Sequence, residues 1–328
     1  MKIKPMEDKP IKPKDSDCCG SGCKPCIFDV YEENLKKWKS GRLNKKNKSN
    51  ALKQDKYSPF LIIDSKYVTD TLKFIQFKGV HLKKNSSDDV RLENTVVDVD
   101  YDLLEGKLNI QSGEYLILKG SNEENHLISR SYTPVLNEPE NDGCIFAIYV
   151  SLIKNGNMSE FIRKVNVNDI LFWRGPYTEF KYVRNSYDHL ICFAGGTGIV
   201  PLYNITKSIV LDDDENTRIK FLCSFKSVKH VILKNELFTL NHYWNFNLKI
   251  FISRDDDDGC DDDKKNKSTY NEIIKHKKID ESIVSNEIND YEDENVLVLI
   301  SGPQSFNESI KNHVLNIGIN ETNIFILS

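Results

Sequence analysis

The segment Arg130-Ser131-Tyr132-Thr133-Pro134 combines several side chains that could do chemistry within a short, extended stretch. In a β-strand, Arg130 and Tyr132 would point to one face and Thr133 to the other. An arginine can bind a pyrophosphate through two parallel hydrogen bonds. A tyrosine can stack on a flat ring system, and a neighbouring hydroxyl can hydrogen-bond a ring nitrogen. The segment therefore suits a flat cofactor that carries phosphates, although taken alone it is equally compatible with a barrel strand bearing a surface arginine.

A second candidate phosphate site is the turn Gly156-Asn157-Met158-Ser159, which leads into the amphipathic stretch 160–165. Backbone N–H groups at the start of a helix attract phosphate groups. A simple N-cap by Asn157 or Ser159 also explains the pattern, and for this piece alone it is the favoured interpretation.

The glycine-rich run Gly195-Gly196-Thr197-Gly198 follows the apolar stretch 189–194 and precedes a helical pattern in which Pro201 lies in the first turn. Glycines allow a dinucleotide to approach the backbone, and the helix start would face its pyrophosphate. The spacing is not G-x-G-x-x-G, so this is not the common Rossmann fingerprint. A tight strand-to-helix turn without a ligand is the alternative.

The segment Ser301-Gly302-Pro303 ends another apolar stretch, 296–300, and a helical pattern follows it. A loop in this position lies at the carboxyl edge of a parallel sheet, where ligands bind in open α/β folds.

Two kinds of element must position these segments. From residue 57 to about 182, short β-rich runs are separated by glycine and polar turns, which predicts a closed β-barrel. From about 189 onward, continuous apolar strands alternate with helical patterns, which predicts a parallel sheet buried on both faces. We therefore expect domains at 57–184 and 185–328, with a disordered insertion at 255–269.

The N-terminal region has its own organisation. We expect a disordered tail at 1–17, a cysteine-rich module at 18–41 and a basic linker at 42–56. The module should contain a helix ending near Ser40-Gly41. Its apolar side chains are spaced to share one face of that helix, namely Phe28, Tyr31, Leu35 and Trp38.

The ordered motifs resemble those of the ferredoxin–NADP reductase superfamily, and more closely those of the cytochrome b5 reductase family. RSYTPV (130–135) resembles its flavin motif, GNMS (156–159) its phosphate motif, and GGTGIVPL (195–202) its nucleotide motif. RGPYTEFKY (174–182) resembles the segment that closes the barrel, and SGPQSF (301–306) stands where the family has C-G-P. CCGSGCKPCIFDVY (18–31) resembles an oxidoreductase-like module that precedes the reductase in the cytochrome b5 reductase-like branch.

The resemblance implies an antiparallel Greek-key β-barrel that binds FAD, followed by a parallel-sheet α/β domain that binds NADH or NADPH. It implies that Arg130 binds the FAD pyrophosphate, that Tyr132 contacts the isoalloxazine and ribityl chain, and that Thr133 lies near the nitrogen that accepts hydride. It further implies two groups of cofactor-binding residues: Ser131, Tyr149, Gly156, Asn157, Met158 and Ser159 for FAD, and Gly195, Gly196, Thr197, Gly198, Pro201, Ser253, Arg254, Gly302 and Pro303 for the nucleotide. The cofactors then do the chemistry, and the protein aligns them and excludes water.

Three departures from the family pattern matter. Ser301, which we expect to be a catalytic-site residue, replaces a cysteine beside the nicotinamide. This replacement should slow hydride transfer without abolishing it. The chain ends in Phe325-Ile326-Leu327-Ser328 rather than in an aromatic residue. Ser253-Arg254 resembles the 2′-phosphate site of relatives that use NADPH, whereas Asp255 would repel that phosphate. This segment favours NADPH as the nucleotide, and NADH is the alternative. The non-functional interpretation is an arginine at a strand end that balances the charge of the acidic loop.

The cysteine cluster Cys18, Cys19, Cys23 and Cys26 could close a tetrahedral zinc site. Zinc sites usually join two separated C-x2-C pairs, however, and only one C-x2-C is present. We therefore predict no metal, and leave a redox thiol pair or a protein-docking module as alternatives.

Composition limits the remaining possibilities. The net charge of −4 indicates no nucleic-acid partner. No stretch approaches the ~20 apolar residues of a membrane span. The N-terminus has no signal-peptide core, and its second residue is not the glycine that N-myristoylation requires. The expected location is cytoplasmic, and association with an organelle is compatible with it.

Two functions remain open. One is a reductase that passes electrons to cytochrome b5 or another haem or iron–sulfur acceptor. The other is a non-catalytic binding module that keeps the fold and docks a partner through the cysteine-rich N-terminus.

Overall fold

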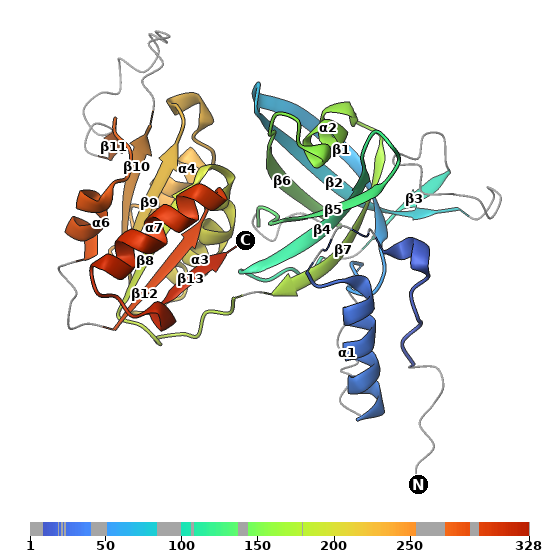
Figure 1. The fold of residues 1–328 in the computed structure, drawn as a ribbon, viewed down its shortest axis with the longest axis horizontal. Coiled ribbons are helices and arrows are strands. Elements are labelled where there is room, and N and C mark those ends of the chain that lie inside the picture. The colour runs from blue at the N-terminus through green and yellow to red at the C-terminus, as the bar shows by residue number, and fades with distance from the viewer. Residues whose placement is uncertain are drawn as a thin grey trace. The chain divides into compact units, whose positions relative to one another are not determined.

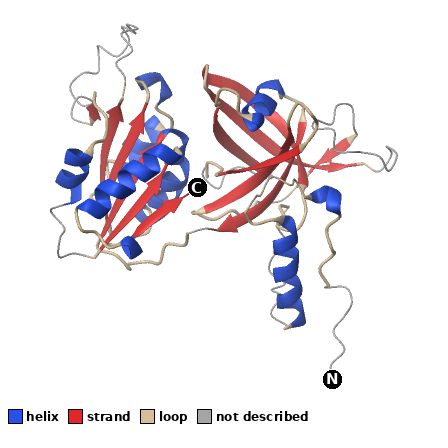
Figure 2. Cartoon of the chain, viewed as in Figure 1, coloured by secondary structure: helices blue, strands red, loops and turns tan. Residues whose placement is uncertain are grey.

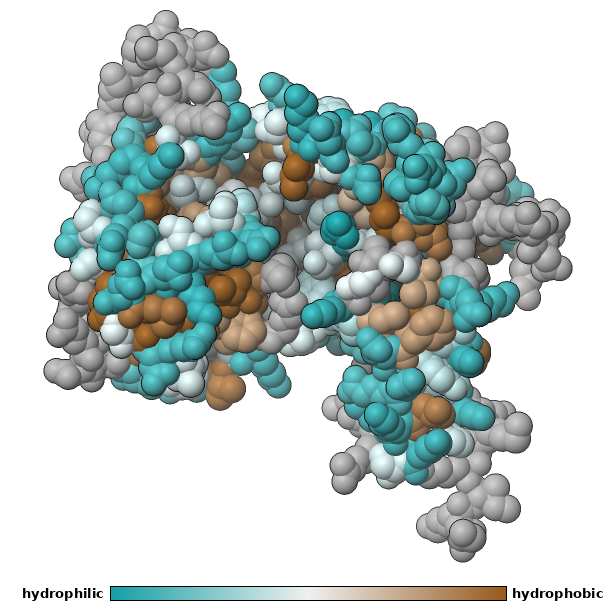
Figure 3. Space-filling view, in the orientation of Figure 1, coloured by the Kyte–Doolittle hydropathy of each residue, from teal (hydrophilic) through white to brown (hydrophobic). Residues whose placement is uncertain are grey.

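The computed structural model describes residues 9–18, 20, 22, 24–40, 51–83, 100–105, 108–136, 144–178, 180–253, 273–288 and 295–327. The chain divides into two compact units (Figure 1). The first contains Met1–Tyr67 and Lys73–Thr178, and the second contains Val68–Leu72 and Glu179–Ser328. The domain limits predicted from the sequence stay predictions. Figure 3 shows hydrophilic side chains spread over the visible surface of each unit, with smaller hydrophobic patches between them.

The first unit is built around a sheet of seven strands, ordered β3-β2-β1-β7-β4-β5 with β6 paired to β2. Antiparallel pairs join β1 with β7, β7 with β4, β4 with β5, and β2 with β3. The strands are β1 (Ser58–Thr69), β2 (Leu72–Leu82), β3 (Tyr101–Leu103), β4 (Glu114–Ser121), β5 (Leu127–Tyr132), β6 (Ile145–Ser151) and β7 (Ile170–Thr178).

A bridge between Val135, which follows β5, and Ala147 of β6 closes this sheet on itself. The closed form confirms the predicted barrel, and alternate side chains along its strands fill the interior. Aromatic rings dominate that interior, because Phe60, Phe77, Phe146 and Trp173 contact one another with centroids about 5 Å apart. One helix, α2 (Asn157–Lys164), lies between β6 and β7 and packs Met158, Phe161 and Ile162 into the same core.

A short 3-10 turn (Asp15–Asp17) precedes the cysteine-rich module, and the module contains the helix α1 (Ile27–Lys39), capped at Ser40 as predicted. The predicted apolar face was not the one that packs most closely. Phe28, Tyr31, Leu35 and Trp38 are only half-buried, whereas Ile27 and Val30 are buried. Val30 packs against Tyr115, Ile117 and Tyr177 of the barrel, so contacts with the barrel select a neighbouring stripe of the helix.

The second unit contains a six-stranded sheet in the order β11-β10-β9-β8-β12-β13, and all its pairings are parallel (Figure 2). Its strands are β8 (His189–Gly195), β9 (Arg218–Phe225), β10 (Phe246–Ile252), β11 (Ile274–Lys275), β12 (Val296–Ser301) and β13 (Ile324–Leu327). Every residue of β8 and β12 is buried, as a sheet covered on both faces requires.

Helices cover both faces of this sheet (Figure 1). They are α3 (Ile199–Val210), α4 (Lys234–Leu240), α6 (Glu281–Ile288) and α7 (Gln304–Asn316). From β8 the chain moves outward to β9 and β10, and then returns to form β12 on the other side of β8. The strand order therefore reverses between β8 and β12, and a ligand is expected at the carboxyl ends of these two strands.

Candidate cofactor-binding sites

The predicted flavin segment lies on the last residues of β5 and just beyond it. Arg130 pairs in register with Leu118 and Tyr132 with Leu116 of β4. The Arg130 side chain is exposed, and its Nη1 donates to the neighbouring Ser129 carbonyl at 2.8 Å. No carboxylate among the described residues pairs with Arg130, so its guanidinium can bind an anionic group.

Tyr132 is fixed by packing at the end of the same strand. Its ring meets Trp173 edge to face, with centroids 6.0 Å apart. Burial raises the pKa of the Tyr132 phenol, and the positive charge of Arg130 works against that rise. The hydroxyl is therefore a neutral hydrogen-bonding group near pH 7. Ser131 is exposed and Thr133 is half-buried immediately after the strand.

The predicted phosphate turn begins α2. Gly156 is the N-cap and has an extended conformation. The Met158 side chain is 6% exposed and packs into the barrel core, which anchors the first turn. The Ser159 hydroxyl accepts a hydrogen bond from Ile153 N at 2.9 Å and thereby closes the preceding loop. Because the first N–H groups of a helix have no partner within the helix, the amides of this turn can bind an anion. Asn157 is exposed beside them.

Two residues that hold α2 were missed in the sequence. Lys73 of β2 is 3% exposed, and its Nζ donates to the carbonyls of Ile162 and Val165 at 3.0 Å each. Gly120 of β4 lies under Phe161, since a Cβ there would be 2.8 Å from the ring. A lysine in an alternating strand is typical of a surface position, so no sequence signal pointed to this role.

Tyr149, also predicted to bind FAD, lies on β6 and is half-buried. Its ring contacts Phe74 of β2 with centroids 5.2 Å apart.

The glycine run at the end of β8 turns directly into a helix. Gly195 ends the strand, 196–198 form one 3-10 turn, and α3 starts at Ile199 with Pro201 buried in its first turn. Gly196 has φ +54°, which favours glycine, and a Cβ there would meet nothing within 4 Å. The backbone at Gly196 therefore faces open space, and Thr197 beside it is half-buried.

The same turn lies against the predicted Ser301 segment. A Cβ on Gly198 would be 2.3 Å from the Ser301 carbonyl oxygen and 2.6 Å from Gly302 N. A Cβ on Gly302 would be 3.0 Å from Gly195 Cα. The structure therefore brings together Gly195, Gly198, Ser301 and Gly302 at the carboxyl ends of β8 and β12, where only backbone fits between the two loops.

Two further residues support this cradle. The Phe306 ring lies 3.0 Å or less from where a Cβ would stand on Gly195 and on Gly302. Asn307 Nδ2 donates to Gly302 O at 3.0 Å, while its buried Oδ1 has no hydrogen-bond partner among the described residues. Phe306 belongs to the recognised SGPQSF motif, whereas Asn307 lies just outside it. Pro303 is exposed and forms the N-cap of α7.

The remaining nucleotide residues lie at another strand end. Ser253 follows β10, and its N–H donates to Phe225 O at 2.9 Å. Arg254, Asp255 and the predicted insertion lie outside the described residues. Near the C-terminus, Phe325 of β13 packs on Phe180 with centroids 4.9 Å apart, so an aromatic pair stands at this strand.

In the cysteine cluster, Cys18 and Cys26 lie with their Sγ atoms 3.9 Å apart, while Cys19 and Cys23 lie outside the described residues. No group of three or more potential metal ligands occurs in the part of the chain that the structure describes. Among the described helices, none has the length and apolar character to cross a bilayer.

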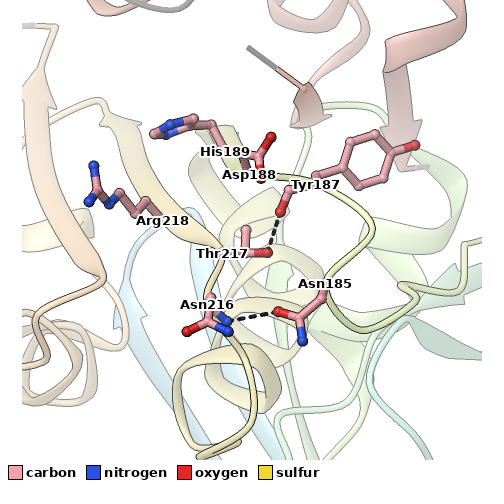
Figure 4. Close-up of a pocket in the computed structure, with 7 residues that line it drawn as sticks. All are labelled: Asn185, Tyr187, Asp188, His189, Asn216, Thr217 and Arg218. Atoms are coloured by element: carbon pink, nitrogen blue, oxygen red, sulfur yellow. Dashed lines mark hydrogen bonds between the residues drawn. The ribbon is translucent and has the colours of Figure 1, made fainter.

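A cavity of about 400 Å³ lies at the other edge of the parallel sheet (Figure 4). It is found where β8 and β9 begin, at His189 and Arg218, and so opposite the glycine run. Figure 4 shows the Tyr187 ring pointing away from the His189 and Arg218 side chains. The polar groups do not converge on one point, and this cavity is not part of the nucleotide site.

Comparison with protein-family models matches three segments of the chain in order. They are the N-terminal oxidoreductase-like protein (residues 5–47), the oxidoreductase FAD-binding domain (80–182) and the ferric reductase NAD-binding domain (187–315). The chain therefore combines an oxidoreductase FAD-binding domain with a ferric reductase NAD-binding domain, behind an oxidoreductase-like N-terminal segment. The resemblance inferred from its motifs is thereby confirmed, together with FAD and a nicotinamide nucleotide as its cofactors.

One relative matches about three quarters of this chain and another matches about two fifths of it. "NADH-cytochrome b5 reductase-like" from Homo sapiens is 29% identical over 250 residues, which cover 76% of this chain and 74% of the relative. "NADH-cytochrome b5 reductase-like protein" from Arabidopsis thaliana is 35% identical over 130 residues, or 39% of this chain and 38% of the relative.

Solved structures share the fold. The cytochrome b5 reductase domain of Ulva prolifera nitrate reductase has a TM-score of 0.61 at 16% identity, covering 85% of this chain and 100% of the other. A ferredoxin NADP+ reductase from Neisseria gonorrhoeae with bound FAD and NADP has a TM-score of 0.52 at 16% identity, covering 83% and 98%. Both neighbours support a β-barrel followed by an α/β domain.

The residues present fit these cofactors. Gly195, Gly198 and Gly302 let the two loops pack closely at the end of the sheet, and Gly196 beside them faces open space, as close approach of a nucleotide to the backbone requires. In the barrel, an arginine without a carboxylate partner among the described residues and a helix start supply the donors that a pyrophosphate needs.

Proposed function

We propose that this oxidoreductase takes a hydride from NADPH or NADH and passes electrons singly to a haem or iron–sulfur acceptor, of which cytochrome b5 is the first candidate. Bound FAD supplies this chemistry, because a flavin accepts two electrons together and releases them one at a time. The observation that carries the proposal is the backbone cradle of Gly198 against Ser301 and Gly302 at the point where the strand order reverses.

In the barrel, the chain's contribution is to bind and orient. Arg130 would pair with the pyrophosphate, and the first-turn amides of α2 at Asn157, Met158 and Ser159 would bind phosphate oxygens. Tyr132, held against Trp173, would lie along the flavin. Thr133 would hydrogen-bond the ring, while Ser131, Tyr149 and Gly156 would line the site.

In the α/β unit, Gly196 and Thr197 would lie under the nucleotide pyrophosphate, with Gly302 and Pro303 beside the nicotinamide. Ser301 is 3% exposed and ends β12. A hydroxyl is less polarizable than the thiol found there in the family, so we expect slower hydride transfer than in relatives that keep the cysteine.

The choice between the two nucleotides rests on Ser253 and Arg254. We expect NADPH to be accepted, because a guanidinium can bind the 2′-phosphate. The neighbouring Asp255 opposes this, and NADH remains the alternative. Arg254→Ala should lower the rate with NADPH while leaving the rate with NADH unchanged.

The function is tested with full-length protein reconstituted with FAD and mixed anaerobically with each nucleotide in a stopped-flow spectrometer. We expect the flavin absorbance to bleach with at least one nucleotide, and the reduced protein to then reduce cytochrome b5.

Arg130→Met should weaken the binding of FAD about tenfold to a hundredfold. This is the effect of losing charge-assisted hydrogen bonds of about 1.5–3 kcal/mol. Arg184→Met, which removes an exposed arginine of the second unit, is the matched control.

Protein that cannot bind FAD, or that binds it and bleaches with neither nucleotide, would contradict the reductase. The second outcome would favour the alternative function, in which the fold is kept as a binding module that docks a partner through its N-terminus.

A further inference from the structure

The thiols of Cys18 and Cys26 meet at the start of α1, with their Sγ atoms 3.9 Å apart. Both side chains are half-buried. Hydrogen bonds fix both backbones, since Cys18 N donates to Asp15 O at 3.2 Å and Cys26 N donates to the Asp29 carboxylate at 3.3 Å. Two thiols in contact are within reach of a disulfide after side-chain rotation.

The segment between these thiols carries contacts that hold the module on the barrel. Tyr115 donates its hydroxyl hydrogen to Lys24 O at 3.2 Å, and Arg174 Nη2 donates to Pro25 O at 2.8 Å. Arg174 is 0% exposed, so it is a buried cation that uses a module carbonyl as one of its acceptors. A bond between Cys18 and Cys26 would close a short loop around both carbonyls.

The other described cysteines behave differently. Cys144, Cys192 and Cys223 are buried, and burial raises the pKa of each thiol. Because the thiolate is the reactive form and must be accessible, these three are poor partners for exchange. Among the described thiols, the pair at the start of α1 is therefore the accessible one.

We propose that Cys18 and Cys26 form a reversible dithiol–disulfide pair, which is oxidised by low-molecular-weight disulfides and fastens the cysteine module to the barrel. One thiolate attacks the external disulfide and displaces one thiolate from it, forming a mixed disulfide. The second cysteine then attacks its partner's sulfur and displaces the other external thiolate. The chain loses two protons and two electrons, and the external disulfide becomes two thiols. This proposal goes beyond the reductase function and does not depend on it.

The test uses full-length variants and oxidised glutathione as the probe. All four module cysteines fall in one tryptic peptide, 15–36, because Lys24 precedes a proline. In Cys19→Ser/Cys23→Ser, only Cys18 and Cys26 remain in that peptide. After oxidation and alkylation, we expect it to carry no alkyl group and to be lighter by two hydrogen atoms. The matched variant Cys18→Ser/Cys26→Ser should keep both remaining thiols alkylated.

Hydrogen–deuterium exchange of the 27–39 amides supplies the second measurement. It should slow on oxidation of Cys19→Ser/Cys23→Ser and recover after reduction with dithiothreitol. The proposal is overturned if, after oxidation of Cys19→Ser/Cys23→Ser, Cys18 and Cys26 are still alkylated, form a disulfide between two chains or remain as mixed disulfides with glutathione. It is also overturned if Cys19 and Cys23 of Cys18→Ser/Cys26→Ser form a disulfide at a lower oxidant concentration. One tightly bound zinc per purified wild-type chain, with thiols released only by a chelator, would also overturn it. A disulfide that leaves the exchange unchanged would refute the fastening.

Discussion

Gly198 must be a glycine because the backbone of another loop lies directly against it. An added Cβ would stand 2.3 Å from Ser301 O, and a carbonyl at the end of a buried strand cannot move aside as a flexible side chain could. Gly196, two residues earlier, is glycine for a different reason, namely its φ of +54° above open space. The two glycines can therefore be separated by experiment.

We expect Gly198→Ala to lower the free energy of unfolding by about 1–3 kcal/mol, as overpacking typically does, and to weaken nicotinamide nucleotide binding. Gly196→Asn should leave stability within about 1 kcal/mol, since asparagine tolerates this conformation, but should obstruct the nucleotide. Urea unfolding and nucleotide titration check both effects. Equal stability of the two variants would refute the close contact.

Tyr182, which is not one of the predicted cofactor-binding residues, shows how burial changes the pKa of a side chain. Its hydroxyl contacts Thr217 Oγ1 at 2.7 Å and donates to Glu215 Oε1 at 3.3 Å. Burial is the main cause that raises the pKa of Tyr182 to about 12 from 10. The Glu215 carboxylate is itself buried and accepts N–H groups of Asn185 and Thr217.

This shift predicts a loss of stability at high pH. A folded-state pKa above the unfolded value means that the stabilisation is complete below pH 10 and is lost as pH rises toward 12. We expect the free energy of unfolding to fall more steeply between about pH 10 and pH 12 in wild type than in Tyr182→Phe. Tyr132 and Tyr177 titrate in both proteins, so the difference isolates Tyr182. Parallel curves would contradict the prediction.

At the scale of elements, α2 is held at both ends. Ser159 closes the loop at its start, and the Lys73 ammonium binds the carbonyls of Ile162 and Val165 at its end. Desolvation lowers the pKa of Lys73, and the nearby Asp169 partly offsets this. A cation at a helix C-terminus is also favoured by the helix dipole.

Lys73→Met should leave those carbonyls without donors and lower the free energy of unfolding by about 1–3 kcal/mol. Because α2 carries the proposed phosphate amides, FAD should also dissociate faster. Lys66→Met on the neighbouring strand, where the side chain is 64% exposed, should change stability by less than about 0.5 kcal/mol. Matching losses in both variants would show that Lys73 does not position the helix.

Sequence periodicity predicted the elements of the second unit closely, because its strands are continuous apolar runs. The apolar stretches 189–194 and 296–300 start where β8 and β12 start, and each ends one residue before its strand does. The glycine cradle was also predictable, since its motif lies between a strand and a helix. The buried Lys73 and Arg174 were not, because pattern analysis assigns charged residues in strands to the surface. The packed face of α1 was missed because the barrel, rather than the helix period, selects it.

At the scale of the whole molecule, the two cofactors should stabilise different units. FAD at about 100 times its Kd adds about 2.7 kcal/mol to the state that binds it. Hydrogen exchange should slow mainly in β5 and α2 on addition of FAD. It should slow mainly at Gly195–Gly198 and 301–306 on addition of NADPH or NADH. Protection confined to the opposite unit would refute the proposed assignment of sites.

Burial of Arg174 beneath the module also bears on how this protein can be shortened. A chain that begins after residue 40 would retain every predicted cofactor residue. It would nevertheless uncover a guanidinium deprived of the Pro25 carbonyl, together with the rings of Tyr115 and Tyr177 that Val30 covers. An apolar patch with an ill-solvated charge at its centre invites self-association, so a chain shortened in this way should aggregate more readily than the full-length protein.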